Sequence, residues 1–256
     1  MNVFVLIKQV PDTEAMLSVK DGKSINEDNI KWIISPYDEY ALEEALKLKD
    51  TDSGITVNAL TLGPDRTESA LRSALAMGAD SGIHIECEED IDITTRARLL
   101  AEAIKKEGDP GIIFIGRQAI DDDSNQTHIL VAEYLDMPVT TNIISFKYED
   151  NKVIVDREVE DGDIETVEMG IPCVITASKA LNTPRYASLM GIMKAKKIQL
   201  KKISLSELGL DSTENKTNVK RLFSPPEKSP GRVLEGEPEE MVKELVRILK
   251  DEAKVL

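Results

Sequence analysis

Residues 111–135 read GIIFIGRQAIDDDSNQTHILVAEYL, and this stretch decides the fold. Its apolar run at residues 111–116 is typical of a short strand buried on both faces. A polar loop follows and leads at residue 125 into an expected helix, which Pro138 ends. A buried strand that passes through a loop into a helix is the repeating unit of a parallel sheet with helices on both faces.

The same unit recurs through the first half of the chain. Strands are predicted at residues 2–10, 55–62 and 83–86, and amphipathic helices at residues 35–48, 70–77 and 95–107. Ser35 and Asp38 form a capping-box pattern at the start of the first helix, where Pro36 is also tolerated. The expected fold class is therefore α/β, with a Rossmann-like, doubly wound, mostly parallel sheet.

The pattern changes after about residue 140. Residues 142–148 and 152–158 alternate around a polar turn, which predicts a small antiparallel hairpin. Residues 164–169 are a candidate third antiparallel strand. The run CVITA at residues 173–177 is typical of a buried strand that returns to the sheet.

The C-terminal part loses this periodicity. Five of the nine residues at 194–202 are lysine, and a polar, proline-containing stretch follows. Residues 238–252 predict an amphipathic helix. We therefore expect an α/β domain at residues 1–194 and an extended C-terminal arm at residues 195–256.

The composition narrows the function classes. The chain has 32 basic and 47 acidic residues and a net charge of −15, which argues against a nucleic-acid binder. Its two cysteines, Cys87 and Cys173, lie beside apolar residues and are expected to be reduced, and no zinc-ligand spacing is present. No apolar run approaches the roughly 20 residues that cross a bilayer. No charged-then-apolar leader opens the chain, so we expect a cytoplasmic protein that is not inserted in a membrane.

The loop at residues 116–127 lies where open parallel sheets bind ligands, at the carboxyl ends of their strands. The N–H groups near Asn125, Gln126 and Thr127 have no partner within the helix, so they suit a phosphate. The aspartate run at residues 121–123 should repel a phosphate, however. On the residues alone, three interpretations stay open: a nucleotide phosphate site, a structural turn with a charged rim, and a divalent metal site.

The remaining candidate groups do not assemble a catalytic site. His84 lies between isoleucines in a short predicted strand and is expected to be a core or edge residue. His128 lies one turn into the helix beside the candidate site, where a surface histidine is more common than a phosphate ligand. No serine lies in a nucleophile-elbow setting, and no catalytic triad is present. These features favour a binding or carrier protein over a hydrolase.

Five stretches resemble, in chain order, the beta subunits of electron transfer flavoproteins. They are VLIKQVPDT (5–13), SPYDEYALEEAL (35–46), LGPDRTESALRSALAMGAD (62–80), GRQAIDDDSNQT (116–127) and LNTPRYASLMGIMKAKK (181–197). The most specific parts are ALAMGAD and the loop motif around the aspartate run. The resemblance covers most of the chain up to about residue 200, and it implies the adenine nucleotide α-hydrolase-like form of the doubly wound fold.

The resemblance implies an electron carrier rather than an enzyme. Such a beta subunit pairs with an alpha subunit, which holds most of the redox-active FAD at their interface. In the common branch of the family, the beta subunit also buries a structural AMP. Carried over to this chain, the AMP contacts are Leu6, Ser35, Pro36, Tyr37, Asp38, Leu62, Ala119, Ile120, Asp121, Asp122, Asp123, Ser124, Asn125, Gln126, Thr127, His128, Ile129 and Leu130. Under this interpretation the three aspartates shape the loop and bind no metal.

A second branch of the family bifurcates electrons and holds another FAD where AMP would lie. The chain keeps the three aspartates and the run Asn-Gln-Thr at residues 125–127, which resembles the AMP branch. Residues 35–38 look more like the bifurcating branch, and His128 stands where glycine is common in the AMP branch. We expect AMP, with a second FAD as the alternative.

The resemblance also implies two protein partners. Residues 181–197 look like the family's recognition loop, which docks on acyl-CoA dehydrogenases and related flavin dehydrogenases. The expected docking residues are Arg185, Tyr186, Leu189, Met190 and Met193, a cluster with adaptable thioethers. The arm at residues 195–256 would pack on the alpha subunit, and the loop at residues 9–13 would approach its flavin. A stand-alone adenine-nucleotide-binding protein is the competing class.

Overall fold

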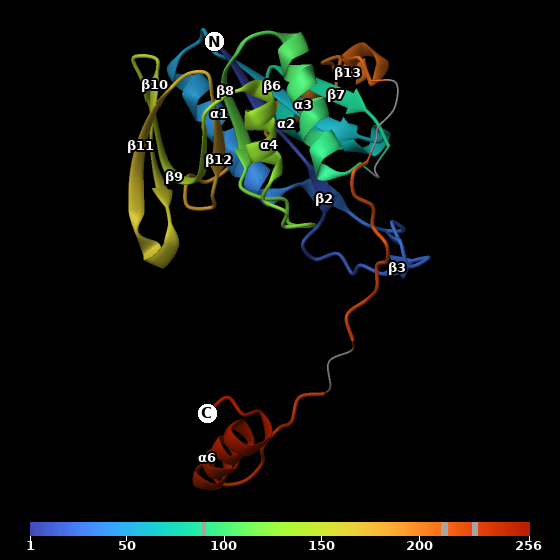
Figure 1. Cartoon of the computed structure of the whole chain (residues 1–256), viewed down its shortest axis with the longest axis vertical. Coiled ribbons are helices and arrows are strands. Elements are labelled where there is room, and N and C mark those ends of the chain that lie inside the picture. Colours follow the sequence, from blue (N-terminus) through green and yellow to red (C-terminus); the bar gives the residue numbers. More distant parts are fainter. Residues whose placement is uncertain (89–90, 211–214, 227–229) are drawn as a thin grey trace.

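A nine-stranded sheet forms the centre of the molecule in the computed structural model, which describes residues 1–88, 91–210, 215–226 and 230–256 (Figure 1). Its strands, in spatial order, are β11 (Ile164–Gly170), β10 (Lys152–Glu158), β9 (Val139–Glu149), β12 (Cys173–Ala177), β8 (Pro110–Gly116), β1 (Asn2–Leu6), β6 (Thr56–Gly63), β7 (Ser81–Glu86) and β13 (Lys201–Ser204). The pairs from β9 to β13 are parallel, whereas β9, β10 and β11 pair antiparallel. The mostly parallel sheet and its antiparallel extension confirm the expected fold class.

Helices cover both faces of the sheet. One apolar core joins α1 (Pro36–Thr51) and α2 (Glu68–Met77) to one face, and a second core joins α3 (Ile93–Glu107) and α4 (Thr127–Leu135) to the other. Successive side chains of β1 alternate between the two cores: Val3 and Val5 belong to the first, and Phe4 and Leu6 to the second. This alternation explains why the strand is almost continuously apolar.

The chain reverses its direction of winding beside β1. The strands β6 and β7 follow on one side of β1, and β8 then pairs with its other side. The carboxyl ends of the strands at such a reversal splay apart and leave a crevice where ligands bind. In this protein those ends belong to β1, β6 and β8.

The first predicted strand is shorter than expected. β1 ends at Leu6, and β2 (Gln9–Pro11) turns away to pair antiparallel with β5 (Trp32–Ile34). In the chain, another small hairpin of β3 (Val19–Lys20) and β4 (Ser24–Ile25) comes between β2 and β5. The Asp38 carboxylate accepts hydrogen bonds from the backbone N–H groups of Lys8 and Gly116. Asp38 therefore ties the exit of β1 to the end of β8.

The capping-box prediction at Ser35 and Asp38 is wrong. Ser35 does precede α1, but its side chain makes no capping hydrogen bond, and its buried Oγ has no hydrogen-bond partner among the described residues. In a capping box the Asp38 side chain would accept from the backbone N–H of Ser35. Here its carboxylate instead accepts hydrogen bonds from the backbone N–H groups of Lys8 and Gly116. A tertiary contact has replaced the local one.

The C-terminal part extends away from the sheet (Figure 1). β13 lies in the predicted arm but pairs with β7, so the sheet reaches beyond residue 194, and the division into a domain and an arm stays a prediction. The helix α6 (Pro238–Arg247), continued by the π-helical turn η4 (Ile248–Glu252), has no buried residue and stands apart from the body. Residues 211–214 and 227–229 of the predicted arm lie outside the described residues.

Short elements complete the fold. They are the helix α5 (Leu189–Ala195) and the 3-10 turns η1 (Asp65–Thr67), η2 (Glu160–Gly162) and η3 (Ser206–Leu208). No helix within the described part of the chain combines the length and the apolar character needed to cross a bilayer.

Candidate functional site

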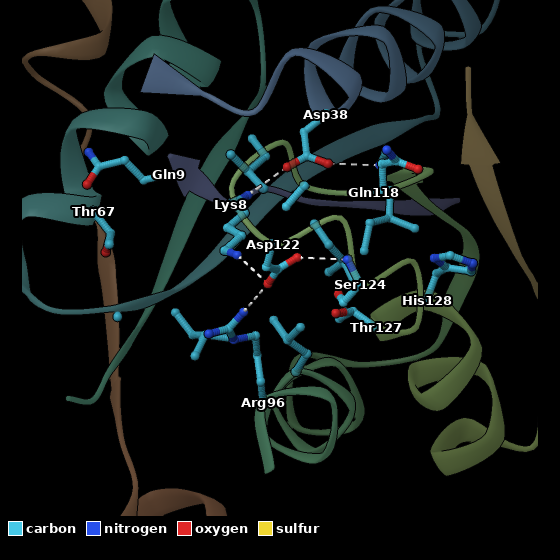
Figure 2. Close-up of a pocket in the computed structure, with 18 of the residues that line it drawn as sticks. Lys8, Gln9, Asp38, Thr67, Arg96, Gln118, Asp122, Ser124, Thr127 and His128 are labelled. Atoms are coloured by element: carbon cyan, nitrogen blue, oxygen red, sulfur yellow. Dashed lines mark hydrogen bonds and ion pairs between the residues drawn. The ribbon is translucent and has the colours of Figure 1, made fainter. Parts of the chain in front are cut away.

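A cavity opens at the carboxyl ends of β1, β6 and β8, at the reversal of winding (Figure 2). The loops after these three strands line it, together with the N-terminal end of α4 and residues from α3. Residues from the segments 8–13, 35–38, 62–65 and 116–127 all contribute, because the carboxyl ends of parallel strands meet at one edge of the sheet. The cavity is therefore the place where the sequence motifs converge.

The structure brings together about half of the expected nucleotide contacts. Those that line the cavity are Leu6, Asp38, Leu62, Ala119, Asp122, Ser124, Asn125, Gln126, Thr127 and His128. Those that do not are Ser35, Pro36, Tyr37, Ile120, Asp121, Asp123, Ile129 and Leu130. Ile129 is 46% exposed and Leu130 packs on the core beneath α3 and α4, since successive residues of a helix face different directions. The nucleotide contacts themselves stay a prediction.

Four basic residues at the cavity were not among the nucleotide contacts expected from the sequence. They are Lys8, Arg66, Arg96 and Arg117. Lys8 follows the first strand and could have been found, because it lies at a strand's carboxyl end. Arg96 comes from α3, and nothing in its local sequence distinguishes it from an arginine on a solvated helix face.

Lys8 and Arg96 form ion pairs with two of the three aspartates. The Nζ atom of Lys8 lies 2.7 Å from Oδ1 of Asp121. It also lies 2.8 Å from Oδ2 of Asp122, and Arg96 lies 3.7 Å from the same oxygen (Figure 2). Burial raises the pKa of Asp122, but the hydrogen bond and charge of Lys8, together with hydrogen bonds from Ser124, outweigh burial and lower that pKa overall. Because cations of the protein itself bind these two carboxylates, the contacts favour a role of the aspartates in shaping the loop over a role as metal ligands.

The loop backbone is shaped by further local contacts. Oδ1 of Asp122 accepts a hydrogen bond from the N–H of Ser124, and the carboxylate of Asp123 accepts one from Nε2 of Gln118. Asp123 and Asn125 both have positive φ, 47° and 51°, which aspartate and asparagine tolerate better than most residues. The helix α4 consequently begins at Thr127, two residues later than expected.

The N-terminal end of α4 suits an anion. Its N-cap residue is Gln126, whose side chain makes no capping hydrogen bond among the described residues. The N–H groups of the first turn have no acceptor within the helix, and the helix dipole adds a partial positive charge. This end of α4 borders the cavity through Gln126, Thr127 and His128.

His128 is buried, so its interpretation as a surface histidine is wrong. Its side chain is 2% exposed and lines the cavity. Burial lowers its pKa to about 4, so the imidazole is neutral at physiological pH. It can offer one N–H donor and one nitrogen acceptor, but no positive charge.

Asp38 is the most perturbed carboxylate at the cavity. It is 4% exposed, and burial raises its pKa to about 7 even though two backbone N–H groups favour the ionised form. The other acidic lining residues are Glu88 and Asp122, so the described residues give the cavity three acidic and four basic side chains. On a chain of net charge −15 this lining is unusually basic.

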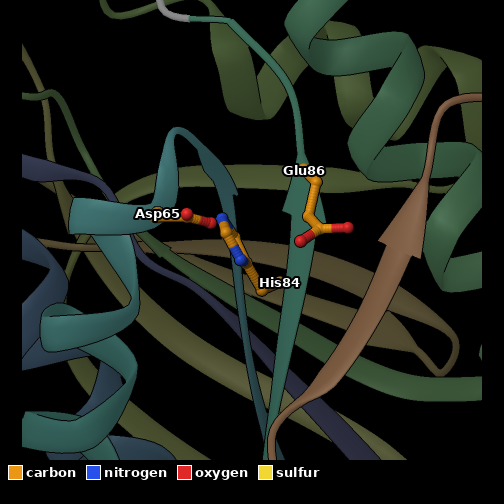
Figure 3. Close-up of side chains that lie close together, drawn as sticks. All are labelled: Asp65, His84 and Glu86. Carbon is orange, nitrogen blue, oxygen red and sulfur yellow. The ribbon is translucent and has the colours of Figure 1, made fainter.

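A second group of titratable side chains lies beside β7, where Asp65, His84 and Glu86 are close together (Figure 3). His84 is fully buried, as expected for a core histidine, and its Nε2 lies 2.9 Å from the carbonyl oxygen of Gly63. The ammonium of Lys202 lies 2.9 Å from Glu86 and 3.5 Å from Asp65. Lys202 thus supplies the positive charge between these carboxylates.

Comparison with known proteins agrees with this geometry. A sequence model described as the electron transfer flavoprotein domain matches residues 23–208. Three relatives are named electron transfer flavoprotein subunit beta. The Bacillus subtilis protein is 42% identical over 100% of both chains, and the Arabidopsis thaliana protein, named mitochondrial, is 39% identical over 100% of both. The Mus musculus protein is 39% identical over 90% of this chain and 91% of its own.

The chain belongs to the electron transfer flavoprotein family, as a beta subunit. This membership confirms the resemblance found in the sequence. An electron transfer flavoprotein involves a flavin, and a subunit beta implies an alpha subunit as its partner. The protein is an electron-transfer component and not an enzyme of the usual kind.

The expected docking residues of this electron transfer flavoprotein subunit lie mostly on the surface. Tyr186 is 98% exposed, Met190 81%, Leu189 76% and Met193 59%. Arg185 differs, because its guanidinium contacts carboxylates of α1. The segment is also not a plain loop, since α5 forms within it.

Proposed function

We propose that the cavity holds a structural AMP. The observation that carries this proposal is the uncapped N-terminal end of α4, which borders a cavity lined, among the described residues, by four basic and three acidic side chains. Backbone N–H groups at a helix start bind phosphate well, and the neutral His128 suits an uncharged part of the ligand, such as a base or a ribose. The ligand would be bound by Lys8, Arg96 and the loop at residues 119–128.

A titration tests the phosphate site. The complex of this chain with its alpha subunit is freed of AMP with a mild chaotrope and then titrated by calorimetry with AMP and adenosine. We expect AMP to bind at least about 10-fold more tightly, because charge-assisted hydrogen bonds are the strong ones. Equal affinities for AMP and adenosine would refute the phosphate site.

A second FAD in the same cavity is the alternative. Residues 35–38 favour it because they resemble the bifurcating branch, and His128 departs from the glycine that is common at its position in the AMP branch. Uptake of added FAD by the AMP-free complex, with a Kd below that of AMP, would decide for this alternative. A stand-alone nucleotide-binding protein would instead be stable without the alpha subunit, and ATP hydrolysis by the purified chain would refute the carrier role.

We further propose that this chain completes the flavin pocket of the alpha subunit. The FAD would be held mainly by the alpha subunit, and the loop at residues 9–13 would approach it. The arm, with the amphipathic helix α6 standing apart from the body, would pack on the alpha subunit, because an apolar helix face needs a covering surface. We also propose that the protein is cytoplasmic.

Residues 186–193 are proposed to dock an acyl-CoA dehydrogenase or a related flavin dehydrogenase. Support comes from the exposed cluster of Tyr186, Leu189, Met190 and Met193, since exposed apolar clusters of this kind mark binding sites. Replacement of Leu189 by alanine is expected to raise the KM of the dehydrogenase for the complex about 10-fold. The exposed Ile164 of β11 provides a control, since Ile164→Ala should leave the KM unchanged.

A further inference from the structure

The docking segment, defined as residues 181–197, is fixed to the body at its N-terminal side by α1. The carboxylate of Glu43 accepts three hydrogen bonds from Arg185: one from its backbone N–H at 3.0 Å, one from Nε at 2.9 Å and one from Nη2 at 3.0 Å. Asn182 donates to the carboxylate of Glu44 at 2.8 Å and to the carbonyl oxygen of Tyr40 at 3.0 Å. Two neighbouring carboxylates and one backbone carbonyl of α1 therefore hold this end.

The C-terminal side of the segment is fixed by α2. The guanidinium of Arg72 donates to the carbonyl oxygens of Ala195 and Ile198, where α5 ends. Gly191 lies so close to α2 that a Cβ atom there would be 2.2 Å from the carbonyl oxygen of Ala76. The apolar side chains at 186–193 are thus presented on a backbone that is held at both ends.

The two carboxylates that contact Arg185 are in different surroundings. The Glu43 side chain is 7% exposed, whereas the Asp50 side chain, 2.8 Å from Nη2 of the same arginine, is 61% exposed. A buried carboxylate that loses its partner is destabilised strongly, while an exposed ion pair contributes little. Glu43 is therefore the carboxylate that determines where Arg185 lies.

We propose that Glu43 and Arg185 are positioning residues for dehydrogenase docking, acting as a clamp with a buried carboxylate and a half-buried guanidinium that holds Tyr186 and Leu189 in their binding arrangement. This inference rests on the proposed docking function. A surface that is already ordered loses less conformational entropy on binding, so the clamp improves affinity without touching the partner. Arg185 acts through its own backbone, since its guanidinium is occupied by α1.

The test uses the complete complex of this chain with its alpha subunit as electron acceptor for an acyl-CoA dehydrogenase reduced by its acyl-CoA substrate. Glu43→Gln and Arg185→Gln are each expected to raise the KM for the complex about 10-fold and to leave kcat within about twofold. The double variant should be no worse than either single one, because both remove the same clamp. Tryptic cleavage after Lys194 should become faster in all three.

Asp50→Asn is the matched control, since it removes an exposed carboxylate from the same arginine. Its KM should stay within about twofold of the unmodified value. Should Arg185→Gln prove insoluble because it leaves the buried carboxylate of Glu43 unpaired, Glu43→Gln alone tests the clamp. An unchanged KM in Glu43→Gln or Arg185→Gln, with a raised KM in Leu189→Ala, would overturn the clamp but not the docking. An unchanged KM in Leu189→Ala would overturn the docking function and the clamp with it.

Discussion

Replacement of Asp38 by alanine tests how the cavity floor is built. The Asp38 carboxylate is the acceptor for the N–H groups of Lys8, at 2.8 Å, and Gly116, at 2.9 Å. Each buried donor left without an acceptor costs about 1–3 kcal/mol, so the variant should lose about 2–6 kcal/mol of local stability. Asp38→Asn keeps one carbonyl oxygen as acceptor and should lose about half of that amount.

Hydrogen exchange measured by mass spectrometry on the complete complex provides the assay. Peptides that contain Lys8 and Gly116 should exchange faster in Asp38→Ala, because exchange of these amides requires local opening of the ends of β1 and β8. Peptides from the remote strands β10 and β11 serve as the internal control and should be unchanged. Native exchange rates at both Lys8 and Gly116 in Asp38→Ala would refute the reasoning.

Further predictions concern the same cavity. The pKa of Asp38 is about 7 in the folded protein and about 3.9 in the unfolded chain. Its contribution to the free energy of unfolding is therefore complete below pH 4 and is lost as the pH rises to 7. Urea unfolding from pH 5 to 8 should show this loss of stability in the native complex and not in Asp38→Asn. Gly116→Ala should destabilise the complex in thermal unfolding, because its Cβ would lie 2.5 Å from Oδ1 of Asp38 and 2.6 Å from the backbone of Tyr37; an unchanged Tm would contradict this contact. Lys8→Met should weaken AMP binding in calorimetry by about 10-fold, since Asp121 and Asp122 lose their shared cation, and an unchanged Kd would show that the aspartates do not affect the ligand.

The mostly parallel sheet and the position of the cavity could largely be predicted from the sequence. The buried run at residues 111–116 and the similar run at the N-terminus predict parallel strands, and parallel strands place their following loops at one edge. That rule alone brings Leu6, Leu62 and the aspartate loop together, as the structure confirms. It needs no knowledge of side-chain contacts.

The contacts between these loops could not be predicted. Asp38 matches a local capping pattern, but a contact across 78 residues, to the N–H of Gly116, takes its carboxylate instead. Arg96 reaches Asp122 from a helix whose sequence resembles any amphipathic surface helix. The burial of His128 depends on which face of α4 packs against the sheet, and the position of one residue near the helix start does not show that.

The identity of the nucleotide is the central claim, and it is tested by what the native protein contains. The complex of this chain with its alpha subunit is purified without added nucleotide and denatured, and the released nucleotides are separated by chromatography and quantified against protein. We expect one AMP and one FAD per complex. Two FAD and no AMP would contradict the account and assign the cavity to a second flavin.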